Sequence, residues 1–274
     1  MGSFSGKTVF ITGASRGIGK AIGLRLARDG ANIVVAAKTA QPHPKLPGTV
    51  YTAATEMDNA GGAGLAVVMD VRFEEQVRAA VERAVEHFGG IDVVINNASA
   101  ISLTDTEHTS MKRFDLMQAV NTRGTYLTTA TCVPWLEGAS NPHVLNLAPP
   151  LNLDPKWFKN HVAYTMAKYG MSMCVLGHAA EYRDRGIAVN ALWPRTAIAT
   201  KAIELIGGPA MRAQCRSVDI MADAAFAILS RDAKSCTGNF FIDDDVLREE
   251  GIDDLSGYAI DPTQNLLQDF FIDE

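Results

Sequence analysis

The sequence lacks long hydrophobic runs and closely spaced cysteines, and these absences exclude several protein classes. No apolar stretch approaches the roughly 18 residues that a membrane-spanning helix needs, so we expect no membrane span. The N-terminus has no basic region followed by a signal-like apolar segment. The four cysteines show no CxxC spacing, which is typical of reduced thiols and not of a metal site; they are Cys132, Cys174, Cys215 and Cys236. We therefore expect a cytoplasmic protein with no metal site.

The chain also lacks an excess of basic residues. Its 25 Lys and Arg against 31 Asp and Glu give a net charge of −6. Residues 243–274 hold 11 of the acids and one Arg, so the rest of the chain carries 24 basic and 20 acidic residues. This balance is too small for nucleic-acid binding as a main function, but it allows a local positive pocket for a phosphorylated cofactor. An acidic C-terminal extension, 251–274, is expected to pack on the body or to trail from it.

Short apolar runs alternate with longer helical patterns along most of the chain. The apolar runs are continuous, as strands of a parallel sheet covered on both faces require; they span 7–12, 32–37, 64–70, 91–96, 143–148, 187–193 and 238–243. The clearest helix lies within 73–90, where an apolar stripe ends at two glycines. This alternation predicts an α/β protein with one domain, 1–250, built on a doubly wound, mainly parallel sheet of about seven strands.

A glycine-rich turn, TGASRGIG at 12–19, follows the first expected strand and opens a helix. Glycines let the backbone approach a pyrophosphate closely, and the helix N-terminus offers free N–H groups and partial positive charge. Its place between a strand and a helix, at the start of an alternating chain, makes dinucleotide binding the favoured interpretation. The expected contacts are Gly13, Ser15, Arg16, Gly17, Ile18 and Gly19.

The GxxxGxG spacing of this turn resembles that of the short-chain dehydrogenase/reductase family. The resemblance covers nearly the whole chain, through the motifs Asp70-Val71, Asn96-Asn97-Ala98, Asn121, Tyr164 with Lys168, and Asn190 before Pro194. Stretches such as NLAPPLNL and AYTMAKYGMSM resemble the dehydrogenase portion of the hydroxysteroid dehydrogenase-like proteins.

The resemblance implies a three-layer Rossmann fold with a substrate loop at about 195–220. It also implies a homodimer or homotetramer that associates through helices around 112–137 and 161–183.

The end of the second expected strand bears on the choice of cofactor. An acid there binds both ribose hydroxyls of NAD and repels the additional phosphate of NADP, but this strand ends Ala36-Ala37-Lys38. Lys38 and Arg16 favour a 2′-phosphate, and hence NADP(H) over NAD(H), because charge-assisted bonds to phosphate are strong. Alternatively, both cations simply point into water. By resemblance, the remaining cofactor contacts are Asp70 at the adenine, Val71, Asn97, Ala98, Tyr164, Lys168, Pro194 and Thr196.

A proline-rich stretch, 39–49, follows the same strand. We expect it to be a loop at the ligand-binding edge, or alternatively a rigid surface excursion.

Tyr164 and Lys168 lie four residues apart in a helical pattern, which places them on one face of a helix. An adjacent ammonium stabilises a phenolate and lowers the pKa of the phenol, so Tyr164 is the expected proton donor or acceptor. By resemblance, Lys168 also holds the nicotinamide ribose, and Asn121 carries a proton-relay water by opening the backbone bonding of its helix. A surface Tyr-xxx-Lys pair is the alternative, but the order of the motifs favours the catalytic interpretation.

The family's serine, which binds the substrate oxygen, is missing from its place after the fifth expected strand. Aligned through Asn146, its position falls on Ala148 or Pro149, and no Ser or Thr occurs from 141 to 164. Loss of one such donor typically costs ~10²–10³ in rate, so catalysis is weakened without being abolished. Replacement donors are Ser99, Asn152, His161 or a bound water.

The leading hypothesis is therefore an oxidoreductase that interconverts a ketone or aldehyde and an alcohol. Its substrate is expected to be apolar, because four apolar residues follow the fifth strand and could wall the pocket: Leu151, Leu153, Trp157 and Phe158. The alternative is an NADP-binding sensor or scaffold with little or no catalysis. An acidic tail that binds a partner protein is a third idea.

Overall fold

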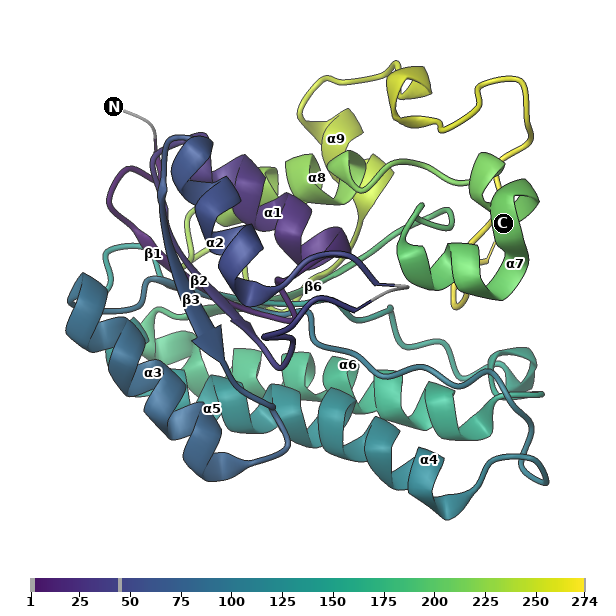
Figure 1. The fold of residues 1–274 in the computed structure, drawn as a ribbon, viewed down its shortest axis with the longest axis horizontal. Coiled ribbons are helices and arrows are strands. Elements are labelled where there is room, and N and C mark those ends of the chain that lie inside the picture. Colours follow the sequence, from purple (N-terminus) through teal and green to yellow (C-terminus); the bar gives the residue numbers. More distant parts are fainter. Residues whose placement is uncertain (1–2, 44–45, 274) are drawn as a thin grey trace.

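A computed structural model describes residues 3–43 and 46–273. Figure 1 shows a sheet between two layers of helices. The sheet has seven strands, all parallel, in the order β3-β2-β1-β4-β5-β6-β7. Its strands are β1 Thr8–Thr12, β2 Asn32–Ala37, β3 Ala63–Val68, β4 Val93–Asn96, β5 His143–Asn146, β6 Ala188–Trp193 and β7 Phe240–Ile242. The predicted seven-stranded, doubly wound α/β fold is confirmed.

One layer holds α1, α2, α8 and α9, and the opposite layer holds α3 to α6 (Figure 1). The helices are α1 Gly17–Ala27, α2 Val50–Asn59, α3 Glu74–Phe88, α4 Met111–Met117, α5 Gly124–Leu136, α6 Val162–Tyr182, α7 Lys201–Ala213, α8 Asp219–Ser230 and α9 Asp243–Glu249. A π-helix, Gln118–Arg123, joins α4 to α5, and short 3₁₀ turns cover Pro155–Trp157, Arg183–Arg185 and Ser256–Tyr258.

The apolar runs become strands because both faces of the sheet are covered. All five residues of β1 are buried, as are five of the six in β2. The stripe predicted in the third helix is buried at Val77, Val81 and Ala84, and the helix ends as expected, at a left-handed Gly89 with φ of 90°.

The order of the strands reverses between β1 and β4, which are neighbours in the sheet. The loops that leave the carboxyl ends of such neighbouring strands separate to opposite faces and open a crevice where ligands bind. The glycine-rich turn after β1 and the Asn97-Ala98 segment after β4 both lie at this edge.

The chain after β7 crosses to α7, where the C-terminus lies (Figure 1). Within 251–273, Leu255, Phe271 and Ile272 are buried. Antiparallel bridges join Thr196 to Gln268 and Arg216 to Ala259. Apolar residues of the acidic extension therefore pack against the loops on either side of α7.

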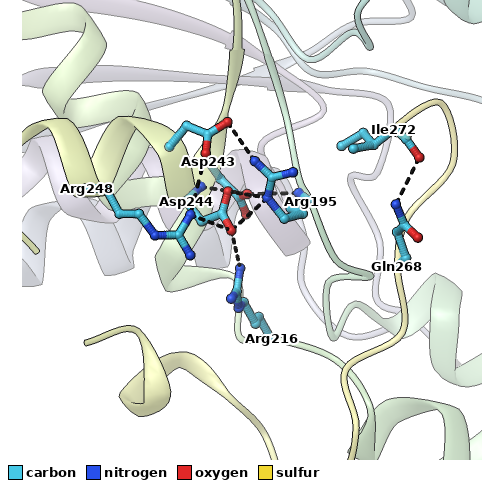
Figure 2. Close-up of polar contacts among 8 residues, drawn as sticks. Arg195, Arg216, Asp243, Asp244, Arg248, Gln268 and Ile272 are labelled. Carbon is cyan, nitrogen blue, oxygen red and sulfur yellow. Dashed lines mark hydrogen bonds and ion pairs between the residues drawn. The ribbon is translucent and has the colours of Figure 1, made fainter. Parts of the chain in front are cut away.

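Asp244, at the start of α9, holds three of these segments together (Figure 2). Its carboxylate is fully buried and pairs with Arg195 at 2.7 Å, Arg248 at 3.2 Å and Arg216 at 3.4 Å. These three arginines come from the loop after β6, from α9 itself and from the loop after α7.

No helix within the described part of the chain is both long enough and apolar enough to cross a membrane.

Replacement of Asp244 by alanine should destabilise the protein strongly, because it leaves three arginines without their buried partner. We expect a loss of about 3–5 kcal/mol in the free energy of unfolding, measured by urea denaturation. Asp245 is the matched control, since it also pairs with Arg195, at 2.6 Å, but its side chain is 52% exposed. Asp245→Ala should cost less than about 1 kcal/mol; equal losses would contradict a special role of the buried carboxylate.

Candidate functional site

A cavity of about 1000 Å³ lies where the strand order reverses. Ten of the fifteen residues expected to bind the cofactor line this cavity: Gly13, Ser15, Arg16, Gly17, Ile18, Lys38, Asp70, Val71, Asn97 and Ala98. The other five lie outside its lining: Gly19, Tyr164, Lys168, Pro194 and Thr196. The size of the cavity suits an extended ligand, since small-molecule sites usually fall between about 300 and 1000 Å³.

The glycine-rich turn fits closely against the end of β4. Asn97 Nδ2 donates to the backbone oxygens of Thr12 at 2.9 Å and Gly13 at 3.2 Å. A Cβ at Gly19 would lie only 2.4 Å from Asn97 Nδ2. A side chain therefore does not fit at position 19, although this residue does not line the cavity. Gly13 and Gly17 have positive φ values of 70° and 60°, which favour glycine.

The N-terminus of α1 opens on this cavity through Gly17 and Ile18. No side chain among the described residues caps the first turn, and the turn carries no acid. A Cβ at Gly17 would meet only Thr200 Cγ2, at 3.8 Å, so the backbone there is open to a ligand. Free N–H groups, the helix dipole and open backbone together suit the pyrophosphate of a dinucleotide.

Two positive side chains, Arg16 and Lys38, also line the cavity. Arg16 donates to the backbone oxygens of Pro47 at 3.1 Å and Gly48 at 2.8 Å, and exposed Lys38 follows buried Ala37. Asp70 pairs with Arg72 at 2.7 Å. Burial acts to raise the pKa of Asp70, but its bonds and charge interaction with Arg72 outweigh that effect and hold the pKa below its ordinary value.

Several residues that line the cavity belong to none of the motifs recognised in the sequence. The proline-rich stretch supplies Thr39 and 46–48, as its position after β2 predicts; its residues 44 and 45 lie outside the described residues. Residues 199–202, within the expected substrate loop, line the same cavity. Arg28, Thr52 and Asp219 carried no sequence signal, because helices distant in the sequence bring them there.

Tyr164 and Lys168 lie one turn apart on α6 and are almost fully buried, with 6% and 3% of their surface exposed. Lys168 Nζ donates to the backbone oxygen of Leu147 at 2.6 Å and lies 4.7 Å from the centre of the Trp193 ring. The end of β5, the end of β6 and α6 therefore meet at this pair.

Asn121 lies in the π-helix and is fully buried. Its side chain accepts from the backbone N–H of Ala100 at 2.7 Å and donates to the oxygen of the same residue at 3.1 Å. The π-helix interrupts the regular α-helical hydrogen bonding of the backbone around Asn121. Such an interruption is what the expected role of Asn121, carrying a proton-relay water, requires.

Burial dominates the electrostatics of the reacting pair. It raises the pKa of Tyr164 above its ordinary value, and the charge of Asp269 raises it further. Burial lowers the pKa of Lys168 to about 7. The expected lowering of the Tyr164 pKa by Lys168 does not appear in this arrangement, because burial and Asp269 both raise that pKa. The Lys168 ammonium donates to the backbone oxygen of Leu147. Tyr164 is therefore a neutral phenol whose ionised form is disfavoured.

The loop after β5 offers no hydroxyl of its own. Ala148 packs with Met171, Val175 and Ala191 in the core under α6. Ser172, on the adjacent face of α6, donates instead to the backbone oxygen of Pro149, at 2.7 Å.

Two of the donors considered as replacements for the serine are already engaged. Asn152 Nδ2 bonds to Asp273 at 2.6 Å, and His161 Nδ1 bonds to Thr165 Oγ1 at 3.0 Å. Ser99 lines the cofactor cavity and is exposed.

The C-terminal segment packs against Tyr164 and Trp193. The Phe271 ring centre lies 6.3 Å from that of Tyr164 and 5.9 Å from that of Trp193, and Trp193 Nε1 donates to the Phe270 oxygen at 2.9 Å. Three of the expected pocket-wall residues join this apolar cluster: Leu151, Trp157 and Phe158. The fourth, Leu153, is 74% exposed, so its expected place in the wall is wrong.

The sequence analysis did not predict that the C-terminal segment packs on Tyr164. The one feature that could have indicated this packing is the pair of phenylalanines, Phe270 and Phe271, in an otherwise acidic tail.

Thr196 lies in the loop after β6, next to the C-terminal segment. Its hydroxyl is buried and has no hydrogen-bond partner among the described residues. Such an unpaired buried group is costly, so it fits a site for a polar ligand group, such as the carboxamide expected here.

Comparison with known proteins agrees with this geometry. A family model described as short chain dehydrogenase matches residues 7–205. The chain is 63% identical to hydroxysteroid dehydrogenase-like protein 2 of Xenopus laevis and 61% identical to that of Homo sapiens. Each match covers all of this chain and 65% of the relative, so the chain spans about two thirds of their length.

A solved short chain dehydrogenase from Mycobacterium thermoresistibile is 51% identical, with a TM-score of 0.94 over 99% of this chain and 96% of that one. The chain therefore belongs to the short-chain dehydrogenase family of oxidoreductases and is similar, over its full length, to the hydroxysteroid dehydrogenase-like proteins.

Proposed function

We propose that the protein is an NADP(H)-dependent oxidoreductase that interconverts a ketone or aldehyde and an alcohol, with Tyr164 as its general acid and base. The observation that carries the proposal is the combination of a dinucleotide-sized cavity with a buried Tyr164–Lys168 pair and a π-helix at Asn121. The apolar cluster around Phe271 supports an apolar substrate.

The preference for NADP(H) over NAD(H) rests on the adenosine end of the cavity. Structures of similar fold hold either cofactor: a dehydrogenase from Mycobacterium paratuberculosis is bound to NAD, and a metagenomic oxidoreductase is in complex with NADP. Those proteins are 19% and 23% identical to this chain, with TM-scores of 0.75 and 0.73, and therefore show only the fold. Here Arg16 and Lys38 line the cavity, and Ala37 stands where an acid would favour NAD.

The bound cofactor would supply or accept a hydride, and the residues of this chain manage the proton and the surroundings. Tyr164, held neutral by burial, donates its proton to the substrate oxygen during reduction. The N-terminus of α1 and Arg16 bind the phosphates, Lys168 faces the cofactor ribose, and Thr196 meets the carboxamide. The aromatic cover excludes water, which strengthens each polar interaction inside.

A sensor or scaffold with little catalysis is the second candidate. The absent serine and a Lys168 with a pKa of about 7 favour it, since both weaken the usual reacting centre. It requires the same cofactor binding but no role for Tyr164 in turnover.

The protein is also proposed to form a homodimer or homotetramer. Large apolar side chains are exposed on α5 and α6: Tyr126, Trp135, Met173 and Leu176. Neighbouring faces of this kind mark protein contacts.

Tyr164→Phe should lower kcat with NADPH and a panel of apolar ketones and aldehydes by at least ~10²-fold, because general acid catalysis contributes about 10²–10⁴. Binding of NADPH, measured by its fluorescence, should persist. Tyr182→Phe is the control, since Tyr182 is buried on the same helix but outside the reacting centre. Turnover that survives Tyr164→Phe unchanged would refute the catalytic role, and NADPH binding without turnover would favour the sensor.

Lys38→Asp should shift the cofactor preference towards NAD, because it removes a charged bond to the 2′-phosphate and adds a ribose-binding acid. The ratio of kcat/KM with NADPH to that with NADH should fall by at least ~10-fold, given about 1.5–3 kcal/mol for a bond to a charged group. Lys234→Asp makes the same change of charge at an exposed site outside the cavity. An unchanged ratio in Lys38→Asp would contradict the assignment.

The double variant Met173→Glu, Leu176→Glu should become monomeric, because charges on the exposed face of α6 oppose its burial between subunits. Light scattering coupled to gel filtration measures the mass. Leu205→Glu, at a similarly exposed residue of α7, should leave the mass unchanged. A monomeric parent protein would itself contradict the proposed assembly.

A further inference from the structure

The side chain of Tyr164, the proposed general acid and base, is enclosed in this structure. Tyr164 is only 6% exposed, and neither Tyr164 nor Lys168 lines the cavity in which the dinucleotide would bind. A general acid must come within hydrogen-bond distance of the substrate oxygen. A carbonyl compound therefore reaches Tyr164 only if a neighbouring segment moves.

The ring of Phe271 fills the space next to Tyr164. The two ring centres are 6.3 Å apart, and Phe271 itself is 1% exposed. Aromatic residues from the loop after β5, from α6 and from the end of β6 surround the same ring, at centre-to-centre distances typical of aromatic contact: Trp157 at 5.9 Å, His161 at 6.3 Å, Tyr169 at 5.2 Å and Trp193 at 5.9 Å. One side chain thus lies at the centre of the cluster that buries the reacting tyrosine.

This ring is carried by residues 267–273, which we call the lid segment. The lid segment contains no helix and no extended strand. The backbone N–H of Leu267 donates to the oxygen of Gln214 at 2.8 Å, and that of Asp269 donates to the oxygen of Arg195 at 3.0 Å. The first half of the lid segment is therefore attached to the chain on either side of α7.

The second half of the lid segment is held by its own turn and by surface contacts. Gln268 Nε2 donates to the oxygen of Ile272 at 2.9 Å, a bond across the turn that Figure 2 shows. Beyond this turn, Asp273 accepts from Asn152 Nδ2 at 2.6 Å and pairs with Lys156. The side chains of that ion pair are 52% and 56% exposed. Because exposed ion pairs stabilise little, the tip of the lid segment is weakly attached.

Phe271 has a backbone conformation that aromatic residues rarely adopt. Its φ is 72°, in the left-handed region, where the Cβ atom is crowded by the backbone. Strain of this kind persists only where the surroundings impose it, and it is concentrated at ligand clamps and switch regions. Here the packing of the ring around Tyr164 imposes it. Withdrawal of the ring would release the strain, so the backbone opposes the closed position.

We propose that the lid segment closes the substrate site, and that Phe271 occupies the place which an apolar ring of the substrate takes when the segment opens. This inference rests on the proposed oxidoreductase function. The rings of Trp157, Tyr169 and Trp193 then contact the substrate as they contact Phe271 in the closed state. Aryl ketones and aryl aldehydes are the substrate class that fits, because their carbonyl group is attached to a ring of the size that is displaced.

Phe271→Ala distinguishes a lid from a fixed wall by the direction in which KM changes. A minor open state is typically populated to about 0.1–10% and reduces the apparent affinity in proportion, so removal of the blocking ring should lower KM for NADPH-dependent reduction of acetophenone at least ~10-fold. A fixed wall that contacts the substrate would instead lose that contact, and KM would rise. A KM that rises or stays unchanged would overturn the proposal.

Phe270→Ala is the matched control, because it removes the same side chain from the neighbouring residue. Phe270 is 36% exposed, its ring contacts His161 at 5.1 Å, and its backbone oxygen still accepts from Trp193 Nε1 in the variant. Its KM for acetophenone should stay within about threefold of the parent, as for a surface substitution. An equal fall in KM in both variants would contradict a specific role of Phe271. Thermal unfolding and NADPH fluorescence check that both variants fold and bind the cofactor.

Asp273→Ala loosens the tip of the lid segment without removing a ring. It should lower KM for acetophenone in the same direction as Phe271→Ala, by about two- to fivefold, as expected for the loss of an exposed pair. A rise in KM would count against the lid, and this variant serves as the second test if Phe271→Ala is too unstable to assay.

The ring size of the substrate is tested in the parent protein. Its kcat/KM for acetophenone should exceed that for 2-butanone at least ~10-fold, because the ring adds several buried carbon atoms and even one methylene in an apolar pocket is worth about 10-fold or more. An equal or reversed order would overturn the assigned substrate class.

Hydrogen exchange tests the motion without reference to any reaction. The N–H groups of Leu267 and Asp269 should exchange at least ~10²-fold faster than those of β6, such as Ala191, because a lid opens locally whereas a central strand opens only with the whole domain. Mass spectrometry of peptides from the parent protein measures both regions. Exchange of the lid segment that is as slow as that of β6 would overturn the lid.

The proposed function is tested separately from the lid. If Tyr164→Phe abolishes turnover but Phe271→Ala has the parental KM, the lid fails and the oxidoreductase stands. If no carbonyl compound shows turnover that depends on Tyr164, the proposed function fails and the substrate role of Phe271 fails with it.

Discussion

The buried carboxylate of Asp244 is the interaction on which the functional end of this protein depends. It gathers arginines from the loop after β6, the loop after α7 and α9 itself. Residues 195–200 are thereby held between the cofactor cavity on one side and the C-terminal segment on the other. A carboxylate buried without such partners would be strongly destabilising, so the three arginines stabilise the buried charge of Asp244. Arg195 pairs with both Asp244 and Asp245 and so connects the loop after β6 to α9.

The position of the C-terminal segment also affects the pKa values of Tyr164 and Lys168. With the C-terminal segment docked, Tyr164 and Lys168 are almost completely shielded from water, and burial shifts each group towards its neutral form. The site therefore differs from the usual picture of a tyrosine activated by a permanently charged lysine.

The loop after β5, where the family's serine is missing, offers no replacement donor of its own. A proline-containing loop after β5 cannot donate through backbone N–H groups at Pro149 and Pro150, and Ala148 belongs to the core. The C-terminal segment, by contrast, packs the ring of Phe271 against Tyr164 and Trp193.

The fold and the glycine-rich turn could be predicted from the sequence alone, because the patterns that indicate them lie within short stretches of the chain. Continuous apolar runs identified all seven strands, since a strand covered on both faces needs no polar position. The glycine-rich turn, Asn97 and the Tyr164–Lys168 spacing are likewise motifs in which a few neighbouring residues carry the chemistry.

Only the tertiary structure decided what depends on contacts between distant segments. The pKa of Tyr164 is raised, opposite to the expected direction, because the residue is buried. Part of that burial comes from Phe271, which lies more than 100 positions later in the sequence. Leu153 turns to solvent while Leu151 turns inward, which a run of apolar letters cannot show. The C-terminal segment is held in place by bonds from the Asp269 N–H to Arg195 and from Trp193 Nε1 to Phe270, and no local pattern encodes contacts between such distant residues.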